Sequence, residues 1–421
     1  MQQHFTLRNG LTVLTTPLNQ TNTVAVFLSV AAGSRYETPA ISGISHFLEH
    51  LMFKGTRTRP STLAISRELD TVGAEYNAYT SKDHTAYYIK VGADHLALAL
   101  DLLSDMMFHS LYDATEMNRE RGVILEEINM YQDNPMMHVE NVNEELVFAG
   151  STLGWQVIGG KPQIRAMSRS QIVAYWQKFY HPKNMVLSIA GKVSDRDRQL
   201  INKYFDRPAR APYRKNSFRV FKSRQQYWQH RARHRDSDQV QLALGWPSFG
   251  YHHPQQYAAN LLSIILGGTM SSRLFIEVRE KRGLAYSVRA SNSPYQDSGC
   301  LMIQAGLDKK RWRTAVEVML AEIEDIKQHG PRPEELHLAK EFVRGHLAIS
   351  LEDSAALAQW YGQQQLLTGA TLSPETKIKK LLAVSGRAVQ TAAQTICCAA
   401  RLNLAIIGPV NAAEVKKVSL P

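Results

Sequence analysis

The sequence predicts an α+β fold of two homologous domains, and three observations lead to that prediction. The chain of 421 residues is too long for one ordinary hydrophobic core, and strand patterns alternate with helix patterns along it. Its second half repeats the order of the first. This order is typical of helices packed on a mainly antiparallel sheet. A basic, proline-containing stretch marks a linker, so we expect domains over 1–206 and 218–421, joined by 207–217.

The first half shows a regular order of strands and helices. Alternating side chains predict strands over 4–17, with a hairpin turn at Asn9-Gly10, and over 23–36. An apolar stripe at helical spacing then predicts a helix that stops near Gly55. After it we expect, in order, a helix over 62–72, two strands over 75–91, helices over 94–108, 113–131, 136–148 and 170–179, and a strand over 185–190. This order is the unit that the second half repeats.

The helix before Gly55 carries the motif His46-x-x-Glu49-His50. At about 100° per residue, both histidines share one face with Glu49 close beside them, opposite the apolar stripe. In the H-x-x-E-H order, the two imidazoles bind zinc and the glutamate takes a proton from the attacking water. The alternative is a solvated face of histidines and a glutamate, so a third ligand is needed to decide.

A later helix supplies carboxylates for that third position, because a catalytic zinc takes three protein ligands. Glu120 and Glu127 lie seven residues apart, which is two helical turns. They share a stripe with Val123 and Ile124, whereas Glu126 points about 100° away. A carboxylate on a buried stripe needs a cation. We therefore predict Glu127 as the third ligand and Glu120 as a residue that hydrogen-bonds a ligand or the water, the alternative being a half-exposed acidic helix.

The second half repeats the first without its metal chemistry. Three pairs of segments correspond: 240–248 with 24–32, 257–268 with the motif helix, and 334–347 with the helix of Glu127. The counterpart of the motif helix has no His, Asp or Glu, and Ala339 stands opposite Glu120. His346 stands opposite Glu127. The second domain is therefore expected to be an inactive repeat.

Composition excludes several classes of protein. Hydrophobic residues form 44% of the chain, and no apolar run approaches the roughly eighteen residues of a membrane helix. The start, MQQHFTLRNG, lacks a secretory signal, so we expect a cytoplasmic protein. Cys300, Cys397 and Cys398 do not form a disulfide framework, which indicates reduced surroundings. The charge of +11 comes without a nucleic-acid-binding motif, so we expect neither a nucleic-acid nor a membrane partner.

With these residues on one chain, the sequence resembles the inverted-motif zinc peptidases that include pitrilysin, insulin-degrading enzyme and the mitochondrial processing peptidase. That family carries HxxEH and a glutamate about seventy-odd residues later, as here. Further matching blocks are NAYTSKDHTAYYIKV, ERGVILEEINMYQDNP, FYHPKNMVLSIAG and SSRLFIEVREKRGLAYSV. The resemblance implies one zinc ion per chain on His46, His50 and Glu127. It implies Glu49 as general base and Glu120 as a supporting acid.

The resemblance also implies a group of substrate-binding residues. In this family an arginine and a tyrosine seven residues apart reach from the second domain to the substrate, in a clamshell that closes on it. Arg279 and Tyr286 match that spacing and can donate hydrogen bonds to a carbonyl that gains negative charge. The segment Asn77-Ala78-Tyr79-Thr80 is expected to be an edge strand that pairs with an extended peptide, with Asn77 holding a backbone group near the cleaved bond. A surface arginine, a buried tyrosine and an ordinary strand are the alternatives.

These expectations combine into a zinc-dependent endopeptidase that cuts unfolded or extended peptides, in precursor processing or in clearance of fragments. The alternative is a non-catalytic scaffold or partner subunit of the same fold, although such subunits usually lack part of the metal motif. Relatives of this size assemble in pairs. Because the zinc-site residues and the pair Arg279 and Tyr286 reside on one chain, we expect a homodimer. The alternative is a heterodimer with a homologous subunit.

Overall fold

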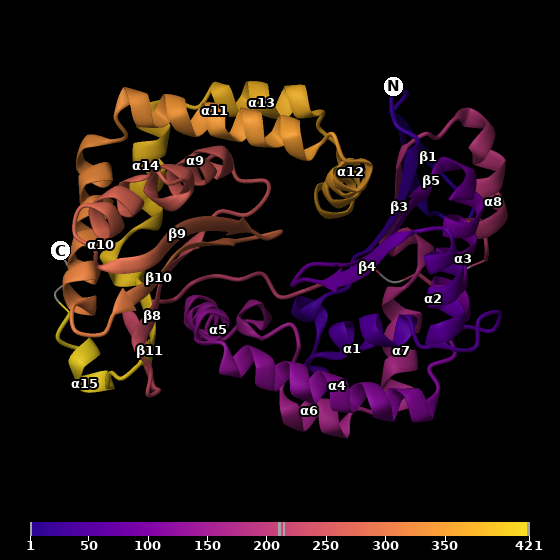
Figure 1. Ribbon diagram of the computed structural model, residues 1–421, viewed down its shortest axis with the longest axis horizontal. Coiled ribbons are helices and arrows are strands. Elements are labelled where there is room, and N and C mark those ends of the chain that lie inside the picture. The colour runs from indigo at the N-terminus through magenta and orange to yellow at the C-terminus, as the bar shows by residue number, and fades with distance from the viewer. Residues whose placement is uncertain (1, 209–211, 214, 419–421) are drawn as a thin grey trace. The chain divides into compact units, whose positions relative to one another are not determined.

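The computed structural model describes residues 2–208, 212–213 and 215–418, and the chain divides into two compact units (Figure 1). The first unit comprises Met1–Ile128, Trp155–Phe218 and Ala348–Leu372, and the second comprises Asn129–Gly154, Arg219–Leu347 and Ser373–Pro421. Of the predicted linker, 207–217, residues 209–211 and 214 lie outside the described part of the chain. Each unit is described by itself below.

The first unit contains a six-stranded sheet with the order β1-β2-β6-β3-β5-β4. Its strands are β1 (Gln3–Thr6), β2 (Thr12–Pro17), β3 (Thr23–Val30), β4 (Glu75–Thr80), β5 (Thr85–Gly92) and β6 (Met185–Gly191). Only β2 and β6 run parallel, so the sheet is mainly antiparallel, as predicted. The hairpin at Asn9-Gly10 is also confirmed, since Gly10 has φ +91° and donates to the carbonyl of Leu7 at 2.9 Å.

The strand predicted over 23–36 is too long, because β3 ends at Val30. The chain then turns into a short 3-10 helix, Ser34–Tyr36. A Cβ on Gly33 would lie 2.5 Å from the carbonyl oxygen of Ser81, so only glycine lets the chain approach the turn between β4 and β5 so closely. A buried ion pair between Arg35 and Asp83 holds the two segments together.

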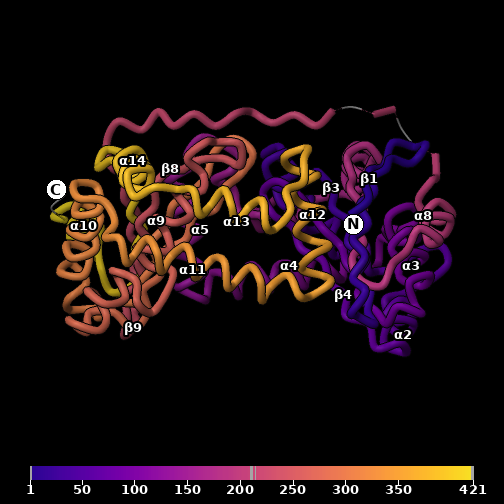
Figure 2. The backbone as a smooth tube through the Cα atoms, turned by 90° about the horizontal axis from the view of Figure 1, so that it is seen from above, coloured from indigo at the N-terminus to yellow at the C-terminus, as the bar shows by residue number. Residues whose placement is uncertain are grey.

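Helices cover both faces of this sheet. They are α1 (Ile44–Met52), α2 (Thr62–Thr71), α3 (Leu96–His109), α4 (Ala114–Asp133), α6 (Lys161–Ala166), α7 (Arg169–Phe179), α8 (Arg198–Phe205) and α12 (Ser354–Thr368). One face of β3 is covered by α12, where Ala25 and Phe27 pack against Leu357 and Tyr361 (Figure 2). Helices α6 and α8 were not predicted. On the other face of the sheet, α1 packs beside β4 and β5.

The second unit repeats this sheet without the first strand. Its order is β7-β11-β8-β10-β9, and only β7 and β11 run parallel. The strands are β7 (Gln229–His234), β8 (Gln239–Ser248), β9 (Ala285–Pro294), β10 (Gly299–Asp308) and β11 (Asn403–Gly408). The helices are α5 (Pro135–Val147), α9 (Gln256–Gly267), α10 (Trp312–His329), α11 (Pro333–Ser350), α13 (Pro374–Leu382), α14 (Gly386–Ile396) and α15 (Ala412–Val415). The predicted internal repeat is confirmed.

Each compact unit contains one helix that comes from the other half of the sequence. Helix α5 lies before the linker but covers β8 and β11 of the second unit, where Asn143 Nδ2 donates to the carbonyls of Ala243 and Asn403 at 3.0 and 2.8 Å. Helix α12 lies after the linker but covers the first sheet. The units therefore differ from a division at the linker by these two segments.

Two further observations bear on the class of protein, one on its helices and one on its cysteines. No helix in the described ranges is both long and apolar enough to cross a membrane. All three cysteines are free, with Cys300 and Cys397 buried and Cys398 exposed.

Candidate metal centre

Helix α1 is fixed at its start by a buried carboxylate. Its N-terminal residue Gly43 has φ +91° and no side chain to cap the helix, so Glu37 accepts hydrogen bonds from the N–H groups of Gly43 and Ser45, at 2.7 and 2.9 Å. Burial raises the pKa of Glu37 to about 7, although these hydrogen bonds oppose the rise. The apolar stripe of the helix is buried as predicted, at Ile44, Phe47, Leu48 and Leu51. The motif residues lie between this stripe and the surface.

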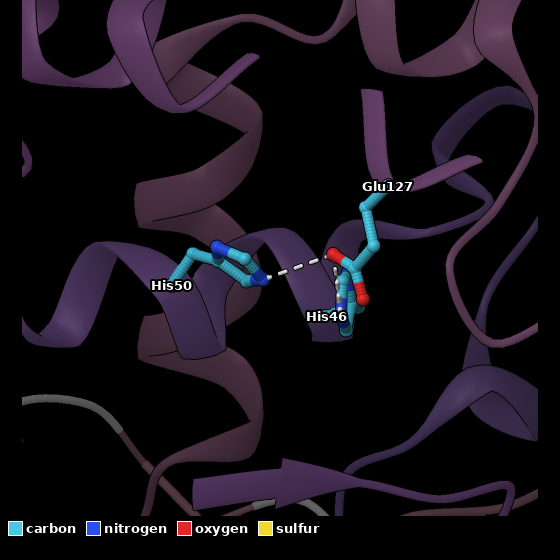
Figure 3. Close-up of side chains that lie close together, drawn as sticks. All are labelled: His46, His50 and Glu127. Carbon is cyan, nitrogen blue, oxygen red and sulfur yellow. Dashed lines mark ion pairs between the residues drawn. The ribbon is translucent and has the colours of Figure 1, made fainter. Parts of the chain in front are cut away.

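The two histidines of α1 meet a carboxylate from α4 (Figure 3). His46 Nε2 lies 3.7 Å from Glu127 Oε2, and His50 Nε2 lies 3.5 Å from the same oxygen. One donor atom from each of the three residues lies within 4.8 Å of the other two. Ligands of a tetrahedral zinc at ordinary bond lengths are about 3.4 Å apart, so this set of two nitrogens and one oxygen fits zinc.

Glu120 supports this group from a position two turns of α4 further back. Its Oε2 lies 3.1 Å from His50 Nδ1, and its Oε1 lies 2.6 Å from Lys54 Nζ. Burial alone would raise the pKa of Glu120, but the hydrogen bonds to His50 and Lys54 outweigh it and lower the pKa. A carboxylate on Nδ1 orients the imidazole and directs Nε2 toward Glu127. This is the supporting position predicted for Glu120.

The predicted stripe of α4 is wrong at one residue. Val123 is 51% exposed, whereas Glu120 and Ile124 are buried. Glu127 is half-buried and Glu126 is exposed. The 3.6-residue period places Val123 and Glu127 on the same side of α4, and both are more exposed than Glu120 and Ile124.

The surroundings of the two histidines shift their pKa values in opposite directions. Burial lowers the pKa of His46 to about 4, and the neighbouring His50 acts in the same direction. Burial would also lower the pKa of His50, but hydrogen bonds to Glu120 and Glu127 outweigh it and raise the pKa to about 9. His50 thus lies between the carboxylates of Glu120 and Glu127, and such surroundings favour a cation. Binding of a metal cation would require the neutral imidazole, because a metal ligand must be deprotonated.

Glu49 lies beside the ligand group and is bound differently from Glu127. Its Oε2 accepts a hydrogen bond from Thr80 Oγ1 at 2.6 Å. Burial raises the pKa of its carboxyl group, and the bond from Thr80 opposes the rise. A carboxyl group with a raised pKa is better able to take up a proton near neutral pH.

Strand β4 is an edge strand of the first sheet, which confirms its predicted place. Asn77 Oδ1 accepts a hydrogen bond from the N–H of Ala78 at 2.8 Å. Tyr79 points to the face covered by α12, where its hydroxyl accepts from Gln359 Nε2 at 3.0 Å and from Gln363 Nε2 at 2.6 Å. Thr80 points to the opposite face, toward α1.

Arg279 and Tyr286 lie in the second unit, whereas the residues of the metal pocket and β4 lie in the first. Arg279 lies in the last turn of a π-helix, Phe275–Glu280, and its guanidinium lies 4.7 Å from the ring centre of Phe275. Tyr286 is 77% exposed on the edge strand β9. The register shifts at this point and leaves Tyr286 without a partner on β10, as in a β-bulge.

Sequence reasoning missed the contacts by which three residues, Glu37, Lys54 and Thr80, hold this site. Lys54 lies one helical turn after His50, and that spacing is a usable signal for a contact near the motif. The partners of Glu37 and Thr80 come from the loop before α1 and from β4, and no spacing rule connects them to the motif.

Comparison with known proteins covers nearly the whole chain. Residues 12–160 match the family model described as insulinase (peptidase family M16), and residues 166–343 match the peptidase M16 inactive domain. A protein of Bacillus subtilis, described as an uncharacterized zinc protease, is 34% identical over 385 residues, which are 91% of this chain and 93% of that protein. Another so described, from Streptomyces coelicolor, is 33% identical over 418 residues, covering 96% of this chain and 89% of its own.

Solved structures show the same fold. A protease from Helicobacter pylori has a TM-score of 0.91 at 25% identity, over 97% of this chain and 99% of its own. An M16 inactive-domain protein from Pseudomonas fluorescens has a TM-score of 0.90 at 20% identity, with 98% of both chains covered. The matched regions include both sheets and the pocket built on α1 and α4.

Proposed function

Because the chain belongs to the insulinase family of peptidases, family M16, we propose that it is a zinc-dependent endopeptidase that cuts unfolded or extended peptides. One observation supports this most directly. His46, His50 and Glu127 bring two nitrogens and one oxygen within 4.8 Å of one another. We assign these residues as the ligands of one zinc ion per chain, with Glu120 as the residue that orients His50.

The chemistry follows from this pocket. A zinc ion held there supplies Lewis acidity, which makes water more acidic and polarises the scissile carbonyl. Glu49 takes the proton from the attacking water and later passes it to the leaving amine nitrogen. Its raised pKa suits both steps, since the same carboxyl group must gain and release a proton. Its position beside the ligands, and not among them, keeps it free for this role.

We assign substrate binding to the edge strand β4 and to two hydrogen-bond donors, Arg279 and Tyr286. The edge segment of β4 that contains Asn77, Ala78 and Tyr79 receives an extended peptide as an added strand of the sheet, through the main-chain groups that point to the open edge. Arg279 and Tyr286 donate hydrogen bonds to the carbonyl as it becomes negatively charged. The exposure of Tyr286, and the bulge that turns it outward, support such a role.

The organisation of the protein is part of the same proposal. The region 1–206 holds the zinc site, 207–217 links the two halves, and 218–421 is the homologous inactive domain that contributes Arg279 and Tyr286. The protein acts as a homodimer in the cytoplasm. The match of residues 166–343 to the inactive domain supports this division of roles.

A pair of neighbouring glutamates on α4 provides the test. Glu127→Gln is expected to lose stoichiometric zinc and cleavage of an unfolded peptide, because it removes one of three ligands. Glu126→Gln makes the same chemical change one residue away, on the exposed face, and should retain both. Zinc is measured by metal analysis after dialysis, and cleavage by mass spectrometry with and without a chelator. Wild-type protein that binds no zinc and cuts no peptide would contradict the proposal and favour the scaffold alternative.

A further inference from the structure

Thr80 makes a specific contact with the proposed base. Its Oγ1 lies 2.6 Å from Glu49 Oε2, and this is the only hydrogen bond that the described residues make to the Glu49 side chain. A hydroxyl group has a single proton to donate. The alternative acceptor, Thr85 Oγ1, is 3.2 Å away and uncharged, so the proton of Thr80 is directed to the carboxylate.

The hydroxyl group of Thr80 is itself fixed from behind. Thr80 and Thr85 face each other across β4 and β5 and share the face toward α1. Thr85 donates to the carbonyl of Ala32 at 2.8 Å, which ties β5 to the loop after β3. Buried Tyr180 and Tyr87, whose hydroxyl groups lie 2.8 Å apart, complete this polar layer behind the base. Thr80 is therefore held in one orientation by its surroundings.

The main chain of Thr80 faces a different way from its side chain. Ser81 N–H donates to the carbonyl of His84 at 2.8 Å at the end of the hairpin. Hydrogen-bonded and non-hydrogen-bonded pairs alternate in antiparallel strands, so the pairs of Tyr79 and Asn77 are hydrogen-bonded to β5. The main-chain groups of Ala78 and Thr80 then point to the open edge. Thr80 thus presents its backbone to the edge and its hydroxyl group to Glu49.

We propose that Thr80 is a positioning residue that links the peptide-docking strand to the catalytic base. This inference rests on the proposed function and adds a residue to it. The hydroxyl group holds one carboxylate oxygen of Glu49, which leaves Oε1 directed to the reacting water. Because the same residue belongs to β4, a peptide that pairs with this edge is placed relative to the base by a single rigid strand.

Three variants test the role of the hydroxyl group in catalysis. Thr80→Val keeps the shape of the side chain but removes the donor, and we expect kcat to fall about 10- to 100-fold, with zinc content unchanged and KM within about twofold. Thr80→Ser restores the donor and should recover most of kcat. Thr12→Val, at a half-buried threonine of strand β2 in the same sheet, is the matched control and should leave both parameters unchanged.

A binding experiment separates positioning from general structure. The affinity of the zinc-loaded protein for a peptide hydroxamate, which binds the metal and hydrogen-bonds the base, is measured by calorimetry in wild type, Thr80→Val, Glu49→Gln and the double variant. If Thr80 acts through Glu49, Thr80→Val weakens binding about tenfold in the wild-type background and by less than about twofold in the Glu49→Gln background. Equal losses in both backgrounds, or no loss in either, would overturn the inference. A wild-type protein that neither binds the hydroxamate nor cuts peptides contradicts the proposed function itself, and this inference with it.

Discussion

Glu49 and Glu127 are carboxylates of one pocket with different surroundings, and these surroundings fit the two roles proposed for them. Glu127 Oε2 lies 3.7 and 3.5 Å from the Nε2 atoms of His46 and His50, so it faces both imidazoles. Glu49 is bound by a neutral hydroxyl group, and burial raises its pKa. The first suits a ligand and the second suits a base.

Glu49→Gln is expected to retain zinc and to lower kcat by a factor of about 10² to 10⁴, because an amide cannot accept the proton of the water. His50→Ala should lose the metal as well. Metal analysis after dialysis and cleavage of an unfolded peptide check both variants. Unchanged cleavage by Glu49→Gln would assign the base to another residue.

At the residue scale, the sequence predicted which residues of one helix lie together better than it predicted contacts between residues of different elements. His46 and His50 could be paired because four residues make about one helical turn, and Glu120 and Glu127 because seven make two. Thr80 could not be assigned, because its contact with Glu49 depends on where β4 is placed in the sheet. The exposure of Val123 shows the same limit, since spacing gives a face of a helix but not how far that face is covered.

The turn between β4 and β5 depends on a buried histidine. His84 Nδ1 lies 2.9 Å from Ser81 Oγ, and His84 Nε2 lies 3.2 Å from Gln363 Nε2 of α12. Burial lowers the pKa of His84 to about 4. The neutral imidazole thus joins the edge strand to the helix that covers the sheet.

Lowering the pH is therefore expected to destabilise the turn between β4 and β5. A histidine whose pKa is lower in the folded than in the unfolded state contributes stability that is present above its ordinary pKa and is lost as the pH falls. Between about pH 6.5 and 4, the free energy of unfolding should fall by about 3 kcal/mol through His84 alone. His84→Gln should flatten that part of the pH dependence, measured by urea denaturation. Equal slopes for the variant and the wild type would contradict the role of His84.

At the scale of elements, the sequence predicted the hairpin and α1, because each depends on local turn residues or on a local period. The edge position of β4 followed from the family resemblance and not from a local pattern. It did not predict that β3 ends at Val30, because the contact of Gly33 with Ser81 is not local. It also did not assign α5 and α12 to their sheets. An amphipathic helix shows which face is buried but not which sheet buries it.

At the scale of the whole chain, the exchange of α5 and α12 makes each unit depend on both halves of the sequence. The sheet of the first unit is covered by residues of α12 that are almost fully buried, namely Leu357, Ala358 and Tyr361. Burial of one large apolar side chain stabilises a fold by about 1.5–3 kcal/mol, so loss of this helix removes a large part of the stability of a domain.

The segments 1–206 and 218–421, produced separately, are therefore expected to lack cooperative unfolding, and their co-expression should restore it. Circular dichroism during thermal unfolding checks this. The matched control is the intact protein cut once within 207–217, which keeps both helices in place and should unfold as the intact chain does. Cooperative unfolding of 1–206 alone would contradict the dependence on α12.

The open edge of β4 has a consequence for selectivity. An edge that recognises main-chain groups takes any segment able to lie straight, whatever its side chains, and ignores segments whose backbone is already saturated in helices or sheets. Peptides that compete for this edge are then selected by their conformation and length more than by their amino-acid composition. A mixture of unrelated denatured fragments should thus inhibit one another's turnover, whereas compact proteins added at the same concentration should have no effect.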